Sequence, residues 1–184
     1  MKNYKISLAG DLGSGKSTVG EVLAKKYSLE KVSIGMILRD LATERGMNVI
    51  EFNKYMETHP EIDYELDNKL KSYEEKEGNF LFDSRLAWHF VPSSFSVYMK
   101  VDINTSAERI LKADRSSEQY ADVNDAVNQL KTRRESESLR YKTFYGVDIL
   151  DMNNYDFVIE TDNKTVTQVA DEIIVAFEKW LENR

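Results

Sequence analysis

A glycine-rich segment near the N-terminus constrains this chain more than any other feature. Residues Gly10–Ser17 read GDLGSGKS and match the pattern G-x-x-x-x-G-K-[ST] at every fixed position. An apolar run precedes the segment, and apolar residues at helical spacing follow it. This context predicts a strand, a tight loop and a helix, with backbone N–H groups and the helix N-terminus arranged to attract phosphate.

Each residue type in this segment suits contact with a polyphosphate. Glycine lets the backbone turn tightly and approach the phosphates without a side-chain clash. We expect Lys16 to bridge the outer phosphates and Ser17 to ligate Mg²⁺ through its hydroxyl group. The residues expected to contact ATP in this segment are Gly10, Asp11, Leu12, Gly13, Ser14, Gly15, Lys16, Ser17 and Thr18.

Alternating apolar runs and helical patterns predict the rest of the architecture. The expected strands are Tyr4–Ala9, Val32–Ile34, Asn79–Phe82, Phe95–Val101 and Phe157–Ile159. Strands that alternate with helices favour a parallel sheet covered by helices on both faces, which is the α/β class. A chain of 184 residues suits a single domain of this kind.

Two long helical stretches exceed what the minimal α/β unit needs. One runs from residue 35 to residue 78, and we expect helices at Met47–Thr58 and Glu61–Glu77, with Pro60 at a first helical turn. The other runs from Ile103 to Met152 and is very polar. Both follow the C-terminal ends of expected strands, where open α/β sheets bind ligands. We therefore interpret them as two mobile covers over the site.

A phosphate-binding loop of this type also needs a carboxylate on a neighbouring strand to hold the metal ion. Asp83 ends one apolar run and Asp102 ends another. We favour Asp83, because Arg85 follows it closely and would place a cation beside the phosphates. Asp102 stays the alternative, since it can equally serve at a helix N-terminus or in a core network.

Arginines are concentrated in the second of these helical stretches, from Ile103 to Met152. Arg115, Arg133, Arg134 and Arg140 lie there, and Arg39 lies just past the second expected strand. Arginine suits phosphoryl transfer because its planar fork binds phosphate oxygens in a bidentate way and never loses its charge. The alternative is a solvated helix with ion pairs to Glu135 and Glu137.

Charge and composition exclude several other functions. The formal net charge is -7, which disfavours a nucleic-acid partner. Cysteine is absent, which excludes disulfides and thiol chemistry but does not fix the compartment, and no run of 18 apolar residues could cross a membrane. The N-terminus shows no export signal, so we expect a cytoplasmic location. The N-K-x-D guanine reader of Ras-type GTPases is also missing.

Several segments together resemble the short, second-type cytidylate kinases of the nucleoside monophosphate kinase family. They are Val32–Arg39, Glu44–Met47, Pro60–Asp63, Asp83–Trp88, Arg133–Ser138, Arg140–Lys142 and Tyr145–Ile149, in the family's order. The resemblance implies a P-loop kinase with sheet order 2-3-1-4-5, an acceptor cover at about 35–78 and a lid at about 112–145. It implies ATP and Mg²⁺ as cofactors, CMP or dCMP as acceptor, and a monomer.

The resemblance also assigns roles to residues. The expected catalytic residues are Lys16, Arg85, Arg134 and Arg140, and Arg115 is expected to contact ATP. The acceptor is expected to contact Gly35, Arg39, Asp63, Arg85, Arg134 and Arg140, and the metal to contact Ser17 and Asp83. Asp63 and Asp67 are the residues that could recognise the base of the acceptor.

The chain departs from the family pattern in places. Ser84 stands where the family usually has glycine, and residues 116–128 align poorly. Acceptor identity therefore stays open, and the same fold could serve AMP or a small metabolite. A non-catalytic ATP-binding module that signals by closure is the rival from another class.

Overall fold

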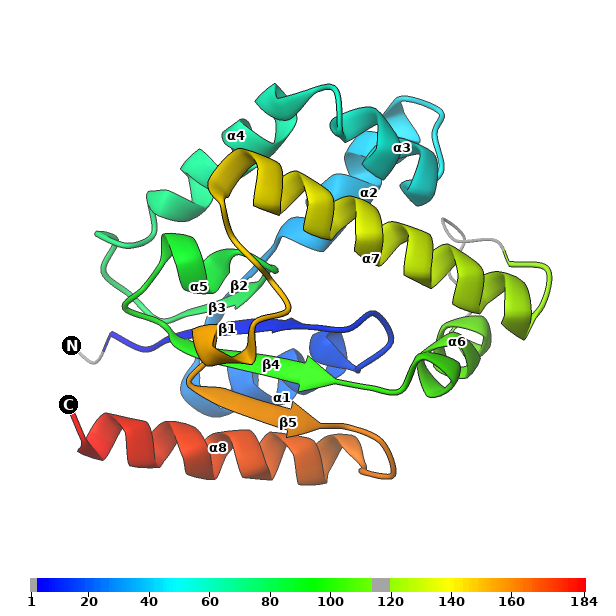
Figure 1. The fold of residues 1–184 in the computed structure, drawn as a ribbon. Coiled ribbons are helices and arrows are strands. Elements are labelled where there is room, and N and C mark those ends of the chain that lie inside the picture. The colour runs from blue at the N-terminus through cyan, green and yellow to red at the C-terminus, as the bar shows by residue number, and fades with distance from the viewer. Residues whose placement is uncertain (1–2, 114–119) are drawn as a thin grey trace.

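A five-stranded parallel sheet forms the centre of the molecule. The computed structural model describes residues 3–113 and 120–184 (Figure 1). Its strands are β1 (Lys5–Gly10), β2 (Glu30–Ser33), β3 (Phe80–Asp83), β4 (Phe95–Lys100) and β5 (Phe157–Glu160). They run in the order β2-β3-β1-β4-β5, which confirms the predicted order, and each expected strand is found within two residues of its predicted ends.

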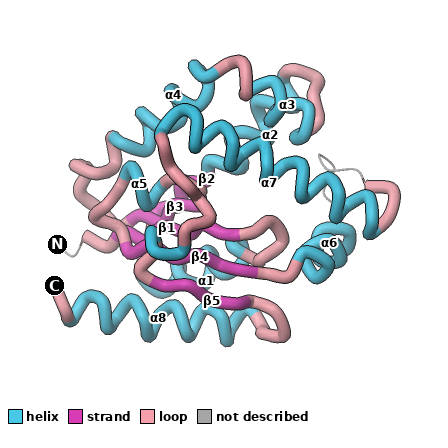
Figure 2. The backbone as a smooth tube through the Cα atoms, viewed as in Figure 1, coloured by secondary structure: helices cyan, strands magenta, loops and turns pink. Residues whose placement is uncertain are grey.

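Helices connect the strands and cover the sheet (Figure 2). They are α1 (Lys16–Tyr27), α2 (Ile34–Glu44), α3 (Val49–Met56), α4 (Pro60–Lys71), α5 (Ala87–Phe90), α6 (Ile103–Lys112), α7 (Val123–Tyr145), the 3₁₀ turn η1 (Met152–Asn154) and α8 (Val166–Glu182). The predicted Glu61–Glu77 helix ends at Lys71, because turn hydrogen bonds at Tyr73 and Glu74 lead the chain toward β3. Pro60 takes the first helical position, as expected.

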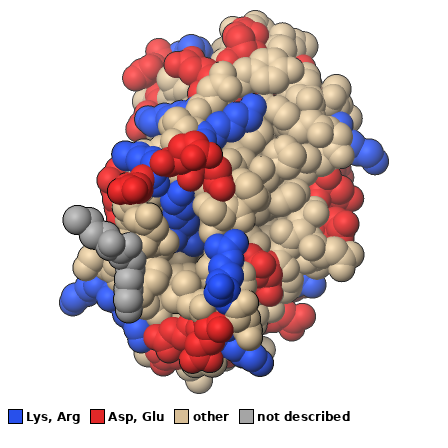
Figure 3. Space-filling model, turned by 90° about the vertical axis from the view of Figure 1, so that its left-hand side faces the viewer, with Lys and Arg blue, Asp and Glu red and all other residues tan. Residues whose placement is uncertain are grey.

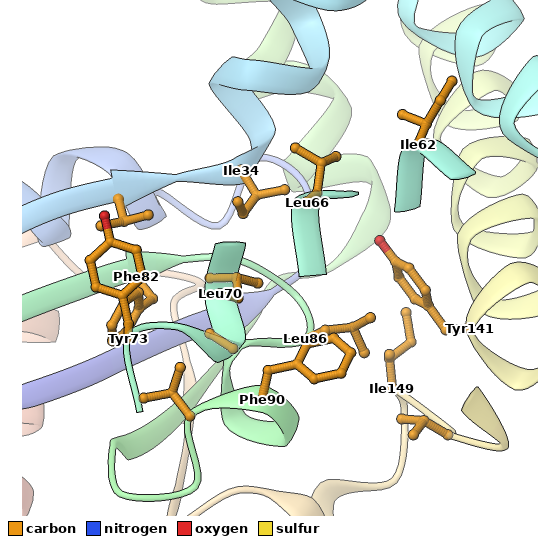
Figure 4. Packing of buried hydrophobic residues seen from close by; sticks show 14 of the residues in the cluster. Ile34, Ile62, Leu66, Leu70, Tyr73, Phe82, Leu86, Phe90, Tyr141 and Ile149 are labelled. Atoms are coloured by element: carbon orange, nitrogen blue, oxygen red, sulfur yellow. The ribbon is translucent and has the colours of Figure 1, made fainter. Parts of the chain in front are cut away.

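Side-chain alternation along the strands divides the interior into two layers. Ile6, Leu8 and Leu81 face α1 and α8, where Phe177 is fully buried. Phe80 and Phe82 face the other layer, which is built from α2 to α5 and α7. Figure 4 shows this second layer, with apolar side chains from the sheet, α4 and α5 converging. Because successive strand residues point to opposite faces, one strand supplies both layers.

Helix caps fix where the covers begin. Ser33 ends β2, and its hydroxyl accepts a hydrogen bond from the Met36 N–H at 3.4 Å, so Ile34 opens α2 instead of closing the strand. Asn48 and Glu51 form a capping box at the start of α3. The chain therefore turns into helix directly at the carboxyl end of β2.

A buried polar layer joins α7 to α3 and α4. Arg140 is 1% exposed, and its Nε donates to Asp63 at 3.0 Å. Its NH1 donates to the Asn53 backbone and side-chain oxygens at 3.1 and 3.0 Å. One turn along, the Tyr145 hydroxyl donates to Asp67. These contacts fix α7 against the cover built from α2 to α4 by polar bonds that need specific geometry.

The surface carries both signs of charge. On the face shown in Figure 3, Lys and Arg side chains alternate with Asp and Glu side chains. Within residues 3–113 and 120–184, no helix has the length and apolar character that a bilayer span requires.

Substitution of Phe177 tests the packing of the layer between the sheet, α1 and α8. The ring of Phe177 packs against Tyr27 and Phe95 at centroid distances of 5.3 and 5.5 Å. Phe177→Ala should lower the free energy of unfolding by about 3–5 kcal/mol, because it leaves a cavity in a packed interior. Val175 lies on the same helix and is 66% exposed. Val175→Ala should therefore stay within about 0.5 kcal/mol in the same urea titration, and equal losses would contradict this packing.

Asp67 makes stability depend on pH. Burial raises its pKa to about 6 from 3.8, although the Tyr145 hydrogen bond lowers it in part. The folded protein therefore holds this proton at pH values where the unfolded chain has lost it. The stability contributed by Asp67 is present below about pH 4 and is lost as the pH rises through 6.

Asp67→Asn should accordingly gain stability relative to the wild type between pH 4 and pH 7, on the order of 1–2 kcal/mol. Urea titrations at several pH values measure this difference. A difference that does not change with pH would show that Asp67 titrates as in the unfolded chain. In Tyr145→Phe, the loss of stability with rising pH should extend to higher pH. This change removes the hydrogen bond that stabilises the Asp67 carboxylate, so the pKa of Asp67 should rise further.

Candidate active site

The carboxyl ends of β1, β2 and β3 open into one cleft under α7. Its walls come from the glycine-rich loop and α1, from α2, from the turn after β3, and from α7. The lining residues are Leu12, Gly13, Gly15, Lys16, Ser17, Thr18, Ile34, Gly35, Leu38, Arg39, Asp83, Ser84, Arg85, Arg133, Glu137 and Tyr141. The predicted phosphate loop and the predicted acceptor residues Gly35, Arg39 and Arg85 therefore share one space.

The glycine-rich loop has a backbone that only glycine adopts easily. Gly10 has a φ of 140°, and a Cβ there would overlap the Met99 carbonyl of β4. Gly15 has a φ of 87° and leads into α1, whose N-terminus receives no side-chain cap. The first N–H groups of an uncapped helix need an outside acceptor. A phosphate group is such an acceptor, so the loop fits the ligand that its sequence predicts.

Lys16 lies folded over this loop. Its Nζ donates to the backbone oxygens of Gly10 and Asp11 at 3.0 and 2.6 Å. Burial lowers the pKa of Lys16 to about 8, and the nearby Arg85 contributes to the shift. These carbonyl oxygens hold the Lys16 ammonium group beside the glycine-rich loop. Phosphate oxygens bound there would compete with them for its hydrogen bonds.

Asp83 lies between two hydroxyl groups at the end of β3. Its Oδ2 accepts from Ser17 Oγ at 3.5 Å and from Ser33 Oγ at 3.4 Å. Among the described residues, no three carboxylate or imidazole side chains gather to form a protein-built metal cage. Mg²⁺ usually takes one or two protein ligands beside substrate phosphates and water, and the Ser17 and Asp83 pair fits that donor set.

Asp102, the alternative metal ligand, has another position. It precedes α6, and its Oδ1 accepts from the N–H groups of Asn104 and Thr105 at 2.8 and 3.3 Å. These backbone bonds lower the pKa of its carboxyl group. Asp102 does not line the cleft.

Two arginines meet one carboxylate on the α7 side of the cleft. Arg85 NH1 donates to the Gly10 carbonyl at 2.7 Å, and Arg85 Nε pairs with Glu137. Arg133 Nε donates to the other Glu137 oxygen at 3.0 Å. Arg133 and Glu137 are four residues apart, as in the solvated alternative, but both are buried.

Arg134 contacts the side chain of Asp11 in the glycine-rich loop. Its NH2 lies 3.3 Å from Asp11 Oδ1, and its side chain is 46% exposed. The Asp11 carboxylate also accepts from the Tyr98 hydroxyl at 3.0 Å and from the Val101 N–H at 3.1 Å. The Asp11 side chain thus ties the loop to the end of β4, and its backbone N–H does the same by donating to the Met99 carbonyl at 3.0 Å.

Other predicted residues lie away from the cleft. Arg140 and Asp63 belong to the buried polar layer described above and do not line the cleft. Arg115 lies outside the described residues. The functional roles predicted for Arg134, Arg140, Asp63 and Arg115 stay predictions.

Three residues that sequence reasoning did not include in the site stand out here. Arg133 and Glu137 line the cleft, and the seven-residue spacing from Arg133 to Arg140 was the signal for a shared helix face. Arg109 NH1 lies 3.4 Å from the Gly13 carbonyl, and its NH2 donates to the Thr161 carbonyl at 2.8 Å. Arg109 therefore flanks the loop on the side away from α2.

Comparisons with known proteins agree with this geometry. The sequence model of the cytidylate kinase-like family matches residues 5–163. The cytidylate kinase of Methanosarcina mazei is 33% identical, over 95% of this chain and 96% of that protein. The cytidylate kinase of Methanococcus aeolicus is 37% identical, over 85% of this chain and 87% of that protein.

A third relative has a different name. The S-adenosylmethionine-dependent nucleotide dehydratase of Lacinutrix mariniflava is 36% identical over 95% of this chain. This chain spans only 36% of that relative's length, so most of the dehydratase has no counterpart here.

Solved structures show the same fold at low identity. A shikimate kinase from Bacteroides thetaiotaomicron has a TM-score of 0.63 at 16% identity, over 96% of this chain and 99% of that one. A deoxyadenosine kinase from M. mycoides has a TM-score of 0.57 at 20% identity, over 95% and 99%. The family match and the two cytidylate kinases support an ATP-dependent nucleoside monophosphate kinase. By its sequence, the chain belongs to the cytidylate kinase-like family.

Proposed function

We propose that this enzyme transfers the γ-phosphoryl group of ATP to CMP or dCMP. The observation that carries the proposal is a single cleft with a phosphate loop on one wall and arginines on the facing walls. Lys16 and Ser17 belong to the first wall, and Arg39 and Arg133 belong to the others. Two phosphate-bearing molecules can therefore meet there with their reacting ends together.

On the donor wall, the loop N–H groups and Lys16 hold the outer phosphates of ATP. Ser17 and Asp83 would hold Mg²⁺, which supplies charge neutralisation between the phosphates when bound. Arg109 lies beside Gly13 and is placed to contact the rest of the donor.

On the acceptor wall, Arg39 would bind the acceptor phosphate through its fork. Arg85 and Arg133 would neutralise charge around the transferred group. Phosphoryl transfer needs mainly alignment and electrostatic stabilisation, which fixed cationic side chains supply without rearranging during the reaction. The position of α7 above the cleft would limit the entry of water, which otherwise competes as acceptor.

The acceptor base is the finer part of the proposal. The cytidylate kinase relatives favour CMP. Ser84, the departure from the family pattern, turns its hydroxyl back to accept from the Leu86 N–H at 3.3 Å. This side chain is 8% exposed and packs into its own turn, which leaves room for an acceptor. Asp63 and Asp67 stay possible base readers, and a monomeric cytoplasmic enzyme stays the expectation.

A panel of acceptors tests the proposed reaction. ADP release should be measured with ATP, Mg²⁺ and CMP, dCMP, UMP, AMP or shikimate. We expect the highest kcat/KM with CMP or dCMP. A preference for AMP or shikimate would show that the acceptor is not a cytidine monophosphate. If no acceptor is phosphorylated, the kinase proposal is contradicted. Lys16→Ala is the control and should lower kcat by at least ~10²–10³-fold with little change in Tm.

The metal site has its own test. Asp83→Asn keeps the shape of the side chain and removes its charge, so Mg²⁺-dependent activity should fall by about 10²-fold or more. Asp102→Asn should retain activity, because asparagine also caps helices well. Both variants should be titrated with Mg²⁺ at fixed ATP and CMP. Loss of Mg²⁺-dependent activity in Asp102→Asn, together with normal activity in Asp83→Asn, would show that Asp102 and not Asp83 is the metal ligand.

A further inference from the structure

Glu137 is a carboxylate in a place that should attract anions. It lies in the C-terminal half of α7, lines the same cleft as Lys16, and is only 4% exposed. A negative charge there repels phosphate, and burial makes that charge costly to keep. Because Glu137 repels phosphate and its buried charge is costly, we expect it to have a function that offsets both effects.

Its contacts point to that role. Glu137 Oε1 accepts from Arg133 Nε at 3.0 Å, and Glu137 Oε2 pairs with Arg85 Nε. Burial alone would raise the pKa of Glu137, but Arg85, Arg133 and Arg140 outweigh burial and hold that pKa below its usual range. The group is therefore ionised, and each of its oxygens meets a different arginine.

The geometry at the two arginines gives the consequence. A guanidinium carries five N–H donors in a rigid planar fork, so a carboxylate that holds Nε also fixes the direction of the remaining donors. Arg85 is fixed from a second side as well, since its NH1 donates to the Gly10 carbonyl of the phosphate loop. Arg85 follows β3 and Arg133 belongs to α7, so one carboxylate sets the relative position of two walls of the cleft.

We propose that Glu137 is a positioning residue that holds Arg85 and Arg133 in register with the phosphate loop. This inference rests on the proposed phosphoryl transfer for its kinetic effect, but its structural content is independent of the acceptor. Two other roles compete with it: Glu137 could only stabilise the fold, or it could bind the substrate through its own oxygens.

Variants at residues 137 and 135 provide the matched comparison. Glu137→Gln keeps the size and removes the charge that both arginines share. Glu137→Asp keeps the charge on a shorter side chain. Glu135→Gln makes the same chemical change two residues away, on the exposed side of α7. All are made in the full chain, and Tm is recorded for each.

The first measurement is anion binding without turnover. Inorganic pyrophosphate is titrated into each protein by calorimetry. If charge alone mattered, Glu137→Gln would bind pyrophosphate more tightly, because a repelling carboxylate is gone. Loss of positioning predicts the opposite sign, with Kd raised about threefold or more. Glu135→Gln should bind as the wild type does, and tighter binding by Glu137→Gln would overturn the proposal.

The second measurement uses the Arg Nε–H signals in NMR spectra of labelled protein. Arg85 and Arg133 should each give a slowly exchanging signal in the wild type, assigned by its loss in Arg85→Lys or Arg133→Lys. Both signals should exchange rapidly in Glu137→Gln and remain slow in Glu135→Gln. Signals that stay protected without the carboxylate would contradict the proposal, whatever the enzyme phosphorylates.

The third measurement separates positioning from direct substrate contact. Glu137→Gln should lower kcat/KM for CMP by about 10–100-fold, with Glu137→Asp losing less. In an Arg85→Gln, Arg133→Gln background the same change should cost about twofold at most, because its targets are gone. A full loss in that background would show direct substrate contact. An unchanged kcat/KM with a lower Tm would show a purely structural role. If no acceptor is phosphorylated but the anion and NMR results hold, only the proposed function fails.

Discussion

The central strand β1 decides where everything else in this molecule can lie. It is hydrogen-bonded to β3 on one side and to β4 on the other, and all of its residues are buried. Because the strands are parallel, the residues that follow them emerge at one edge of the sheet. The Gly10 turn lies at that edge, so the phosphate loop has Asp83 and Arg85 on its β3 side and the end of β4 on the other. Hydrogen bonds from the Val101 N–H, just after β4, to the Asp11 carboxylate and from Arg85 to the Gly10 carbonyl then fix the loop from both sides.

α7 supplies the opposite wall, and its composition is unusual for a buried helix face. The buried residues of this 23-residue helix are Ala126, Leu130, Arg133, Glu137, Arg140 and Tyr141. Three of these six positions carry charge, where a structural helix would place apolar side chains. Buried ion pairs seldom stabilise a fold beyond what apolar packing provides, so their presence favours a functional explanation. Glu137 faces the cleft and Arg140 faces α3 and α4, which makes α7 the element that joins the two regions.

Much of this architecture could be predicted because local patterns and tertiary structure agree. The central strands β1, β3 and β4 are rich in buried apolar residues, the phosphate loop has glycine where the backbone has positive φ, and Pro60 begins a helix. Sequence could not assign the arginines of α7. A helix that is polar all round gives no apolar stripe from which to read the buried face. Arg133 and Arg134 are neighbours in sequence, yet the first lines the cleft and the second pairs with Asp11 in the loop.

The sequence by itself determined the strand, loop and helix of the phosphate cradle and, through its pattern of strands and family motifs, the order of the sheet. These depend on backbone conformation and on side-chain periodicity, which are local properties of the chain. Tertiary structure alone decided which charges meet across the cleft. It set Asp83 beside Ser17, and it brought Arg85 to the Glu137 carboxylate that Arg133 also binds. Ser17 and Asp83 lie 66 residues apart, and Arg85 and Glu137 belong to different elements, so these two pairings follow from how the sheet and α7 pack. The Arg133–Glu137 pair and the Asp102 cap of α6 are local by contrast.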